Sequence, residues 1–211
     1  MDAPPNPSRP RPRSHRRLVL ASASPARLRL LVGAGFCPEV IVSGVEEEGF
    51  EAADLAGLVT GLAEAKAAAV ATRPDAAGAV VVACDSVLDV DGVAHGKPAG
   101  VDEARARLRR LGGRSAILRT GHCVIDTATG RRAAAAAATE VIFARCTDAE
   151  LEAYLDSGES LHVAGAFTLD GRSAPFIEGI VGDHGNVIGL SLPLFRRLLA
   201  DIGLTVMDLW A

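Results

Sequence analysis

The stretch that decides the fold is Val80–Pro98, which reads VVVACDSVLDVDGVAHGKP. Together with Ala79 before it, the stretch opens on an unbroken apolar run that is rich in β-branched residues. Such a run predicts a strand buried on both faces, as in the middle of an α/β sheet. The run ends at Asp85 and Ser86, and sheets of this class bind ligands where their strands end. The pattern therefore predicts a buried strand that ends in a functional carboxylate.

The same stretch also predicts a hairpin. Its Asp-Gly pair lies between two valines in Val90–Val93, which is a strong signal for a two-residue turn. Pairing the two valines places Ser86 opposite Lys97, one residue from Asp85. An ideal pleat would point Lys97 to the Ser86 face, so we expect Lys97 to reach Asp85 because its Gly and Pro neighbours distort the strand. A carboxylate, a hydroxyl and an ammonium are then predicted to meet.

Length and composition limit the class of protein. The chain has 211 residues, of which 49% are hydrophobic, enough for one large core or two lobes. A net charge of −4 argues against nucleic-acid binding, and an anionic substrate would need local basic groups or a metal ion. The four cysteines form no CxxC pair and indicate reduced thiols in a cytoplasmic protein. No segment is long and apolar enough for a membrane span.

Strands and helices are predicted to interleave without a repeat. Residues 1–16 are rich in Pro and Arg and lack the apolar segment of a signal peptide, so we expect a disordered tail before a single domain, 17–211. The predicted class is α/β, with a mixed twisted sheet, flanking helices and two lobes around a central cleft. Strands are expected at 17–22, 40–45 and 115–126, and a second strand after the last of these runs through 140–145 despite its six alanines. Helices are expected from Ser24 to Gly33 or Gly35, and over 102–111, 147–155 and 193–200.

A serine-rich turn follows the first predicted strand. Ser24 before Pro25 is typical of a helix N-cap, and Arg27 lies in the first turn of that helix. Free backbone N–H groups, the positive end of the helix dipole and the hydroxyls of Ser22 and Ser24 could bind phosphate. An ordinary strand-turn-helix unit with a solvated arginine is the alternative, and the turn alone favours it.

Lys66 lies on a further predicted helix, one turn after Leu62 and at the edge of the apolar stripe. Most lysines in such positions reach out to water, whereas one held near a cleft could bind phosphate. The stripe that predicts this helix consists of Leu55, Leu58, Leu62, Ala65 and Ala69.

The hairpin acids Asp89 and Asp91 admit a second interpretation. With the following glycine they resemble the aspartate motif of haloacid-dehalogenase-like phosphatases, in which the first Asp is a nucleophile. That motif needs an apolar strand directly before the first Asp, and here Asp85 and Ser86 interrupt it. The motif also begins near the start of its fold, whereas here a strand-helix-strand-helix block comes first. We therefore interpret Asp89 and Asp91 as residues of the turn.

Several short motifs, in order and in register, resemble the Maf family over the whole chain after the tail. Many motifs in register are far more specific than one. They are Leu20–Arg27, Glu64–Ala67, Cys84–Val87, His95–Pro98, Thr120–His122, Ala164–Phe167 and Asn186–Leu190. The resemblance implies a two-lobed α/β nucleoside triphosphate pyrophosphatase that uses a divalent metal, Mg²⁺ or Mn²⁺. It also implies cytoplasmic nucleotide housecleaning and leaves a homodimer open.

The resemblance assigns roles residue by residue. It makes Asp85 the general base or a metal-binding carboxylate and Glu47 a second acid that holds metal. Lys66 and Lys97 become catalytic residues that neutralise phosphate charge, and the phosphate cradle consists of Ser22, Ser24 and Arg27.

Some positions depart from the family pattern. Ser86 stands where Thr or Gln is usual, and Asp170 stands where Gln or Glu is usual, at positions that track the preferred base. Ala26 replaces an arginine or tryptophan. Ser86 and Asp170 are thus implied to bind substrate, while the nucleobase that the protein prefers stays open. A non-catalytic nucleotide-binding regulator linked to cell division is the rival interpretation, although binding alone does not require Asp85.

Overall fold

The computed structural model describes residues 15–47 and 49–210. Its centre is a seven-stranded sheet with the order β2-β1-β3-β5-β6-β7, and β4 pairs with β3. The strands are β1 (Leu18–Leu20), β2 (Glu39–Val40), β3 (Val80–Val90), β4 (Val93–His95), β5 (Ser115–Asp126), β6 (Arg132–Phe143) and β7 (Ile177–Val181). The helices are α1 (Pro25–Gly33), α2 (Leu55–Ala71), α3 (Val101–Leu111), α4 (Asp148–Asp156), α5 (His184–Ile188) and α6 (Leu192–Asp201).

The sheet is mixed, as predicted. β1 pairs in parallel with both β2 and β3, whereas β3, β5, β6 and β7 form an antiparallel series. The alanine-rich segment is the strand β6, because its pairing with β5 along Ser115–Ile125 outweighs the helix propensity of alanine. The mixed α/β class with flanking helices is thus confirmed.

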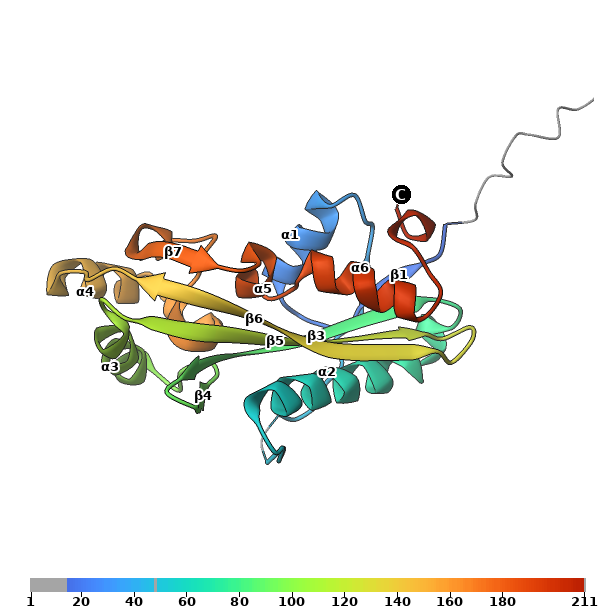
Figure 1. The fold of residues 1–211 in the computed structure, drawn as a ribbon, viewed down its shortest axis with the longest axis horizontal. Helices are drawn as coiled ribbons and strands as arrows, with labels where there is room; N and C mark the ends of the chain where they lie inside the picture. Colours follow the sequence, from blue (N-terminus) through green and yellow to red (C-terminus); the bar gives the residue numbers. More distant parts are fainter. Residues whose placement is uncertain (1–14, 48, 211) are drawn as a thin grey trace, which may run out of the picture.

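Helices cover both faces of the sheet. Figure 1 shows α2 lying along one face of the long strands, with α1, α5 and α6 on the other face. The molecule is elongated, and β3, β5 and β6 run along its length with a visible twist. α3 and α4 lie at the end opposite to α6 and the C-terminus.

The hydrophobic core divides into two parts along the strands. Residues 80–84 of β3 pack into two clusters, one on each face of the sheet, with α1 and α6 on one side and α2 on the other. Leu88 and Val90 of the same strand pack into a different cluster with α3 residue Leu111. Residues 85–87 therefore lie at the junction of two lobes.

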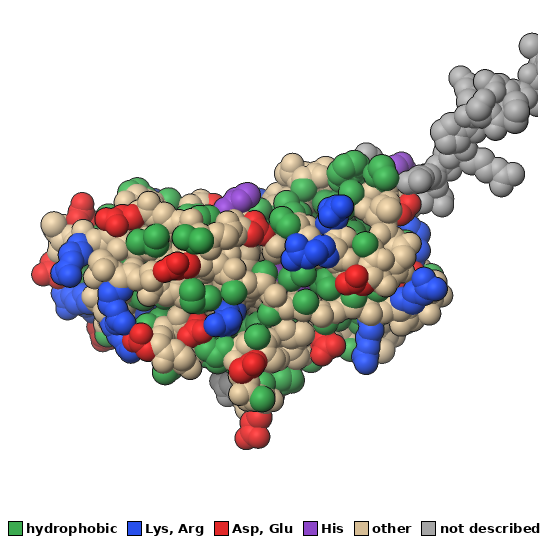
Figure 2. Space-filling view, viewed as in Figure 1, with side chains coloured by type: hydrophobic (Ala, Val, Ile, Leu, Met, Phe, Trp, Pro, Cys, Tyr) green, Lys and Arg blue, Asp and Glu red, His purple; other side chains and the backbone are tan. Residues whose placement is uncertain are grey.

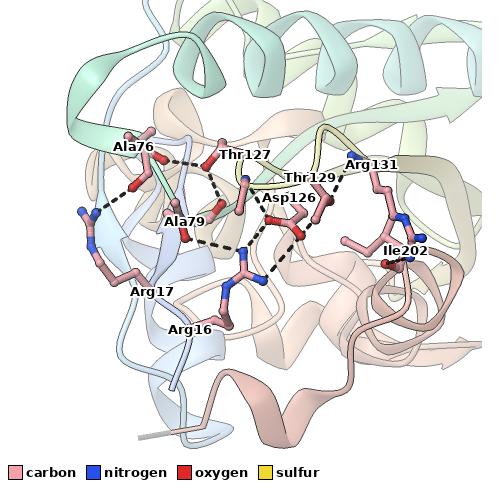
Figure 3. Close-up of polar contacts among 12 residues, drawn as sticks. Arg16, Arg17, Ala76, Ala79, Asp126, Thr127, Thr129, Arg131 and Ile202 are labelled. Atoms are coloured by element: carbon pink, nitrogen blue, oxygen red, sulfur yellow. Dashed lines mark hydrogen bonds and ion pairs between the residues drawn. The ribbon is translucent and has the colours of Figure 1, made fainter. Parts of the chain in front are cut away.

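The first described residues are tied to the sheet. Arg16 forms an ion pair with Asp126, whose side chain is only 3% exposed. Asp126 also accepts hydrogen bonds from the Ala128 N–H and the Thr129 hydroxyl, as Figure 3 shows in part. The Arg16 N–H donates to the Asp208 carbonyl near the C-terminus. Arg16 is the last residue of the predicted tail, 1–16. Residues 1–14 of that tail lie outside the described residues.

Two local predictions need correction. The predicted strand 40–45 is reduced to Glu39–Val40, because its residues find a parallel partner only at β1. The predicted hairpin register, Val90 opposite Val93, is confirmed, but β4 ends at His95. The motif Asn186–Leu190 begins within the short helix α5, which is capped by Asp183.

The surface carries mixed charge. On the face drawn in Figure 2, basic and acidic side chains are interspersed. Many charged side chains of the described residues are paired, for example Arg105 with Glu152 and Arg109 with Asp148. Within residues 15–47 and 49–210, no helix has the length and apolar character to cross a membrane.

Candidate active site

Asp85 lies in a part of β3 that is paired along one edge. β1 pairs with Val80–Val82 and β4 with Leu88–Val90, while β5 pairs with β3 continuously on the other side. The prediction that the strand ends at Asp85 is wrong, because the ladder with β5 carries it on to Val90. The parallel pairing with β1 nevertheless ends just before Asp85. This leaves the carboxylate beside the carboxyl end of a parallel strand, where α/β sheets bind ligands.

Lys66 of α2 joins two carboxylates. Its Nζ lies 2.5 Å from Asp85 Oδ1 and 2.6 Å from Glu47 Oε1. Lys66 is 7% exposed and Asp85 is 5% exposed, whereas the Glu47 side chain is 60% exposed. Removing one partner of a buried ion pair leaves an uncompensated charge, so each side chain fixes the position of the other. Lys66, Asp85 and Glu47, to which the resemblance assigns separate roles, thus lie together in the structure.

The face of α2 that carries Lys66 differs from the predicted stripe. Lys66 lies within the buried face and not at its edge, because the helix meets the sheet through small residues. A Cβ atom on Gly121 would lie 2.0 Å from the Val59 carbonyl oxygen, so only glycine allows this approach. Gly121 is the partner of Asp85 in the ladder with β5. The buried residues of α2 are Val59, Leu62, Ala63, Lys66, Ala67 and Val70.

Burial separates the acidities of the two carboxylates. Burial raises the pKa of Asp85, and the charge and hydrogen bond of Lys66 offset this only in part. Burial acts in the same direction on the pKa of Glu47, but the hydrogen bond and charge of Lys66, with the charges of Lys97 and Arg27, outweigh it and lower that pKa. Asp85 is thus the stronger base of the two, and Glu47 holds a negative charge beside the ammonium.

Lys97 does not reach Asp85 as predicted. It lies two residues beyond the end of β4, and its side chain is exposed. The hairpin register would have placed it opposite Ser86, but the ladder between β3 and β4 runs only from Val90–Val93 to Leu88–His95 and does not reach Ser86. Its charge still lowers the pKa of Glu47, so Lys97 lies on the Glu47 side of the site. Lys66 and Lys97 are the only two lysines of the chain.

The predicted cradle assembles around Arg27. Its Nε donates to the Gly189 carbonyl, Nη1 to Ser22 Oγ and the Cys84 carbonyl, and Nη2 to Ser86 Oγ, over 2.8–3.1 Å. These bonds use four of the five guanidinium N–H groups. Arg27, which the resemblance places in the phosphate cradle, holds two loops and two serines together and keeps one N–H for a further acceptor.

Ser22 and Ser24 form the turn before α1. Ser24 is the N-cap and accepts from the Arg27 N–H, as predicted. Ser22 Oγ accepts from both Arg27 Nη1 and the Ser24 N–H. Both lone pairs of Ser22 are then used, so its own proton is directed elsewhere and can be donated to an anion. Together with the N-terminus of α1, this hydroxyl provides an anion-binding turn.

Asp170 lies apart from these groups. Its Oδ2 is 3.0 Å from Arg29 Nη2. Both side chains line an open groove of about 380 Å³ between α1, α5 and α6, together with Ala26 and His184. Ala26 belongs to the first turn of α1, so this groove begins next to the serine turn. The contacts described for Asp170 do not bring it to Asp85.

Sequence reasoning assigned no role to three residues that support the site. Thr120, His122 and Asn186 are each 0% exposed, and all belong to motifs quoted above. Thr120 and His122 lie opposite Ser86 and Cys84 in the β3–β5 register, whereas Asn186 comes from α5 and its carbonyl accepts from Thr120. A prediction that β3 runs to Val90 and pairs with β5 would have placed Thr120 and His122 beside Asp85.

The donors that could hold a metal ion are carboxylate oxygens. The described residues contain no group of three or more His, Cys, Asp or Glu side chains that could hold an ion. Glu47 and Asp85 share Lys66 through one oxygen each. Two carboxylates fit the way Mg²⁺ is commonly held, with the remaining ligands from water and substrate phosphates. The chemistry of the donor set is therefore compatible with a hard divalent cation.

The site therefore combines a buried carboxylate, ammonium and guanidinium groups and a serine turn at a lobe junction of a mixed α/β sheet, a set of groups whose chemistry suits phosphate. Residues 17–202 match the family of Maf-like proteins, and this chain belongs to that family.

Curated relatives match this chain over most of their length. A protein of Streptomyces coelicolor is 63% identical over 200 residues, covering 95% of this chain and 97% of the relative. One of Streptomyces avermitilis is 61% identical, covering 92% and 95%, and one of Salinispora tropica is 52% identical, covering 92% and 88%. Each of these relatives is named nucleoside triphosphate pyrophosphatase.

Proposed function

We propose that this protein is a nucleoside triphosphate pyrophosphatase that cleaves the α–β phosphoanhydride and releases a nucleoside monophosphate and pyrophosphate. The observation that carries the proposal is the buried Asp85–Lys66 pair beside the Arg27 cradle. The names of relatives at 52–63% identity support it. Non-standard nucleotides are the substrates we favour, in keeping with a housecleaning role.

The reaction needs an oriented water, a base and neutralisation of charge on the leaving group. Asp85 accepts the proton of the attacking water, and its raised pKa suits that task. The water oxygen bonds to the α-phosphorus while the bond to the bridging oxygen of pyrophosphate breaks. Lys66 stabilises the charged carboxylate before the proton arrives.

Positive groups on two sides serve the leaving pyrophosphate. The Ser22 hydroxyl, the N-terminus of α1 and the remaining Arg27 N–H are donors from one side. Exposed Lys97 supplies a mobile ammonium from the other side. A divalent Mg²⁺ or Mn²⁺ ion held by Glu47 and Asp85 would neutralise phosphate charge when bound.

We place the reaction in the cytoplasm. The described cysteines are free, and burial raises the pKa values of the Cys84 and Cys123 thiols to about 12, which keeps both unreactive. A homodimer stays a prediction. The preferred nucleobase of the substrate also stays a prediction, and Ser86 and Asp170 are the residues that we expect to determine it.

A panel of standard and modified nucleoside triphosphates tests the proposal. Each is incubated with the purified protein and Mg²⁺ or Mn²⁺, and pyrophosphate and orthophosphate are measured separately. We expect pyrophosphate from at least one triphosphate, none from diphosphates, and loss of turnover in chelator. Binding of nucleotides with no turnover of any of them would favour the regulator instead.

A further inference from the structure

Ser86 and Thr120 face each other across the β3–β5 ladder. They are directly paired in the register, so both side chains point to the same face of the sheet. Ser86 Oγ and Thr120 Oγ1 are 2.9 Å apart. Thr120 is 0% exposed, so its hydroxyl has only protein partners to satisfy it.

The protons in this pair have one consistent arrangement. Thr120 Oγ1 lies 3.0 Å from the Asn186 carbonyl oxygen, which can only accept, so the Thr120 proton points there. Ser86 must then donate to Thr120. Arg27 Nη2, which can only donate, lies 3.0 Å from Ser86 Oγ and directs its proton to that oxygen. The chain therefore runs in one direction, from Arg27 through Ser86 and Thr120 to Asn186.

The acceptor at the end of this chain is held firmly. Asn186 is 0% exposed, and its Nδ2 donates to the Leu118 carbonyl and to Thr139 Oγ1, both at 3.1 Å. The same segment also holds the other end of the guanidinium, because Gly189 accepts from Arg27 Nε. Arg27 is thus fixed at two points to the α5 segment, once directly and once through Ser86 and Thr120.

We propose that Thr120 is a positioning residue for this site: it keeps the Ser86 hydroxyl turned as an acceptor toward Arg27 and so sets the orientation of the guanidinium. The proposal rests on the proposed function, in which Arg27 organises the phosphate cradle. Without the Thr120 hydroxyl, the Ser86 proton is free to turn, and Arg27 Nη2 loses a fixed acceptor. Thr120 itself need not touch the substrate.

Thr120→Val keeps the shape of the side chain and removes the hydroxyl. We expect KM for the best triphosphate to rise about 5- to 10-fold, the effect of one lost hydrogen bond, with kcat within about 2-fold. Thr120→Ser keeps the hydroxyl and should restore the wild-type KM. Thr139→Val is the matched control: it removes an equally buried hydroxyl that also contacts Asn186 but does not reach Ser86.

A double-mutant cycle separates positioning from general packing. If Thr120 acts through Ser86, Thr120→Val should have no further effect on KM in a Ser86→Ala background. An undiminished effect in that background, or equal effects of Thr120→Val and Thr139→Val, would overturn the proposal. Should Thr120→Val not fold, Thr120→Cys, with a similar volume and a weak S–H donor, carries the same cycle.

A second readout does not depend on turnover. The side-chain NMR signals of Arg27, assigned by their loss in Arg27→Lys, should be slowly exchanging in the wild type and broadened in Thr120→Val but not in Thr139→Val. Unchanged Arg27 signals in Thr120→Val would contradict the proposal even if the wild type proved inactive. An inactive wild type with the expected NMR change would refute the proposed function alone.

Discussion

Lys66 Nζ and Asp85 Oδ1 are 2.5 Å apart, in a contact that joins the middle of α2 to the middle of β3. Gly121, the ladder partner of Asp85, makes this contact possible because it lets the α2 backbone approach the sheet. The pair is buried at the junction of the two lobes, where the low dielectric strengthens each charge interaction.

Asp85→Asn should lower kcat by about 10²–10⁴-fold, because the amide cannot accept the proton of the attacking water. Nucleotide binding should survive, since Lys66 keeps its bond to Glu47. Asp89→Asn is the matched control on the same strand: Asp89 accepts from the Gly92 N–H in the turn and pairs with Arg119, and the variant should stay active. Strong inactivation by Asp89→Asn, with a phosphorylated Asp89 in the wild type, would point to the phosphatase interpretation.

Amine acylation can follow Lys97 directly, because the chain has only two lysines. We expect mass spectrometry to find acylated Lys97, which is exposed, and unmodified Lys66, which is buried and ion-paired. A nucleoside triphosphate should protect Lys97, whereas the matching nucleoside should not, since phosphate charge is what the ammonium binds. Equal acylation of Lys97 with and without triphosphate would remove it from the site.

Gly121→Ala should destabilise the protein by about 1–3 kcal/mol or more and lower activity together with stability, because the new methyl group meets helix backbone that has no room to move. Chemical denaturation measures the first effect and steady-state kinetics the second. Gly179→Ala in β7 is the control, since its Cβ would meet only Ile142 Cδ1 at 3.8 Å. An active, fully stable Gly121→Ala variant would show that α2 is free to shift.

His122 should make stability depend on pH. Burial, helped by the charge of Arg27, lowers the pKa of His122 to about 4, and its Nε2 accepts from the Ser191 N–H. The unfolded chain binds this proton near pH 6.5, so the contribution of His122 is complete above about pH 6.5 and is lost as pH falls toward 4, up to about 3 kcal/mol.

Denaturation of wild type and His122→Gln between pH 7 and pH 4 measures that contribution. The variant should lose less of its free energy of unfolding over this range than the wild type does. His184→Gln, at a side chain that is 69% exposed, should behave as the wild type. Parallel pH curves for wild type and His122→Gln would contradict the assignment.

Much of the fold could be predicted because its signals are local. The bounds of β5, the Ser24 cap of α1, the capping box of α4 and the Val90–Val93 turn all follow from short patterns that the structure retains. The length of β3 could not be read in this way. Its polar residues Asp85 and Ser86 interrupt the apolar run, and only the partner strand β5 shows that the strand continues.

The site was harder to predict than the fold, because its geometry depends on long-range packing. The leucines of α2 suggested one face, but the alanines and Gly121 set the contact with the sheet and turn Lys66 inward. Lys97 was expected beside Asp85 from the hairpin register, yet β4 ends too early to carry it there. The N–H groups of Arg27 donate to backbone and serine oxygens from three segments of the chain, and no single motif contains all three.

The most direct test of the central claim is hydrolysis of the best triphosphate substrate in H₂¹⁸O, with both products analysed by mass spectrometry. Water activated by Asp85 at the α-phosphorus predicts one ¹⁸O in the nucleoside monophosphate and unlabelled pyrophosphate. Labelled pyrophosphate, or a nucleoside diphosphate with labelled orthophosphate, would contradict the account.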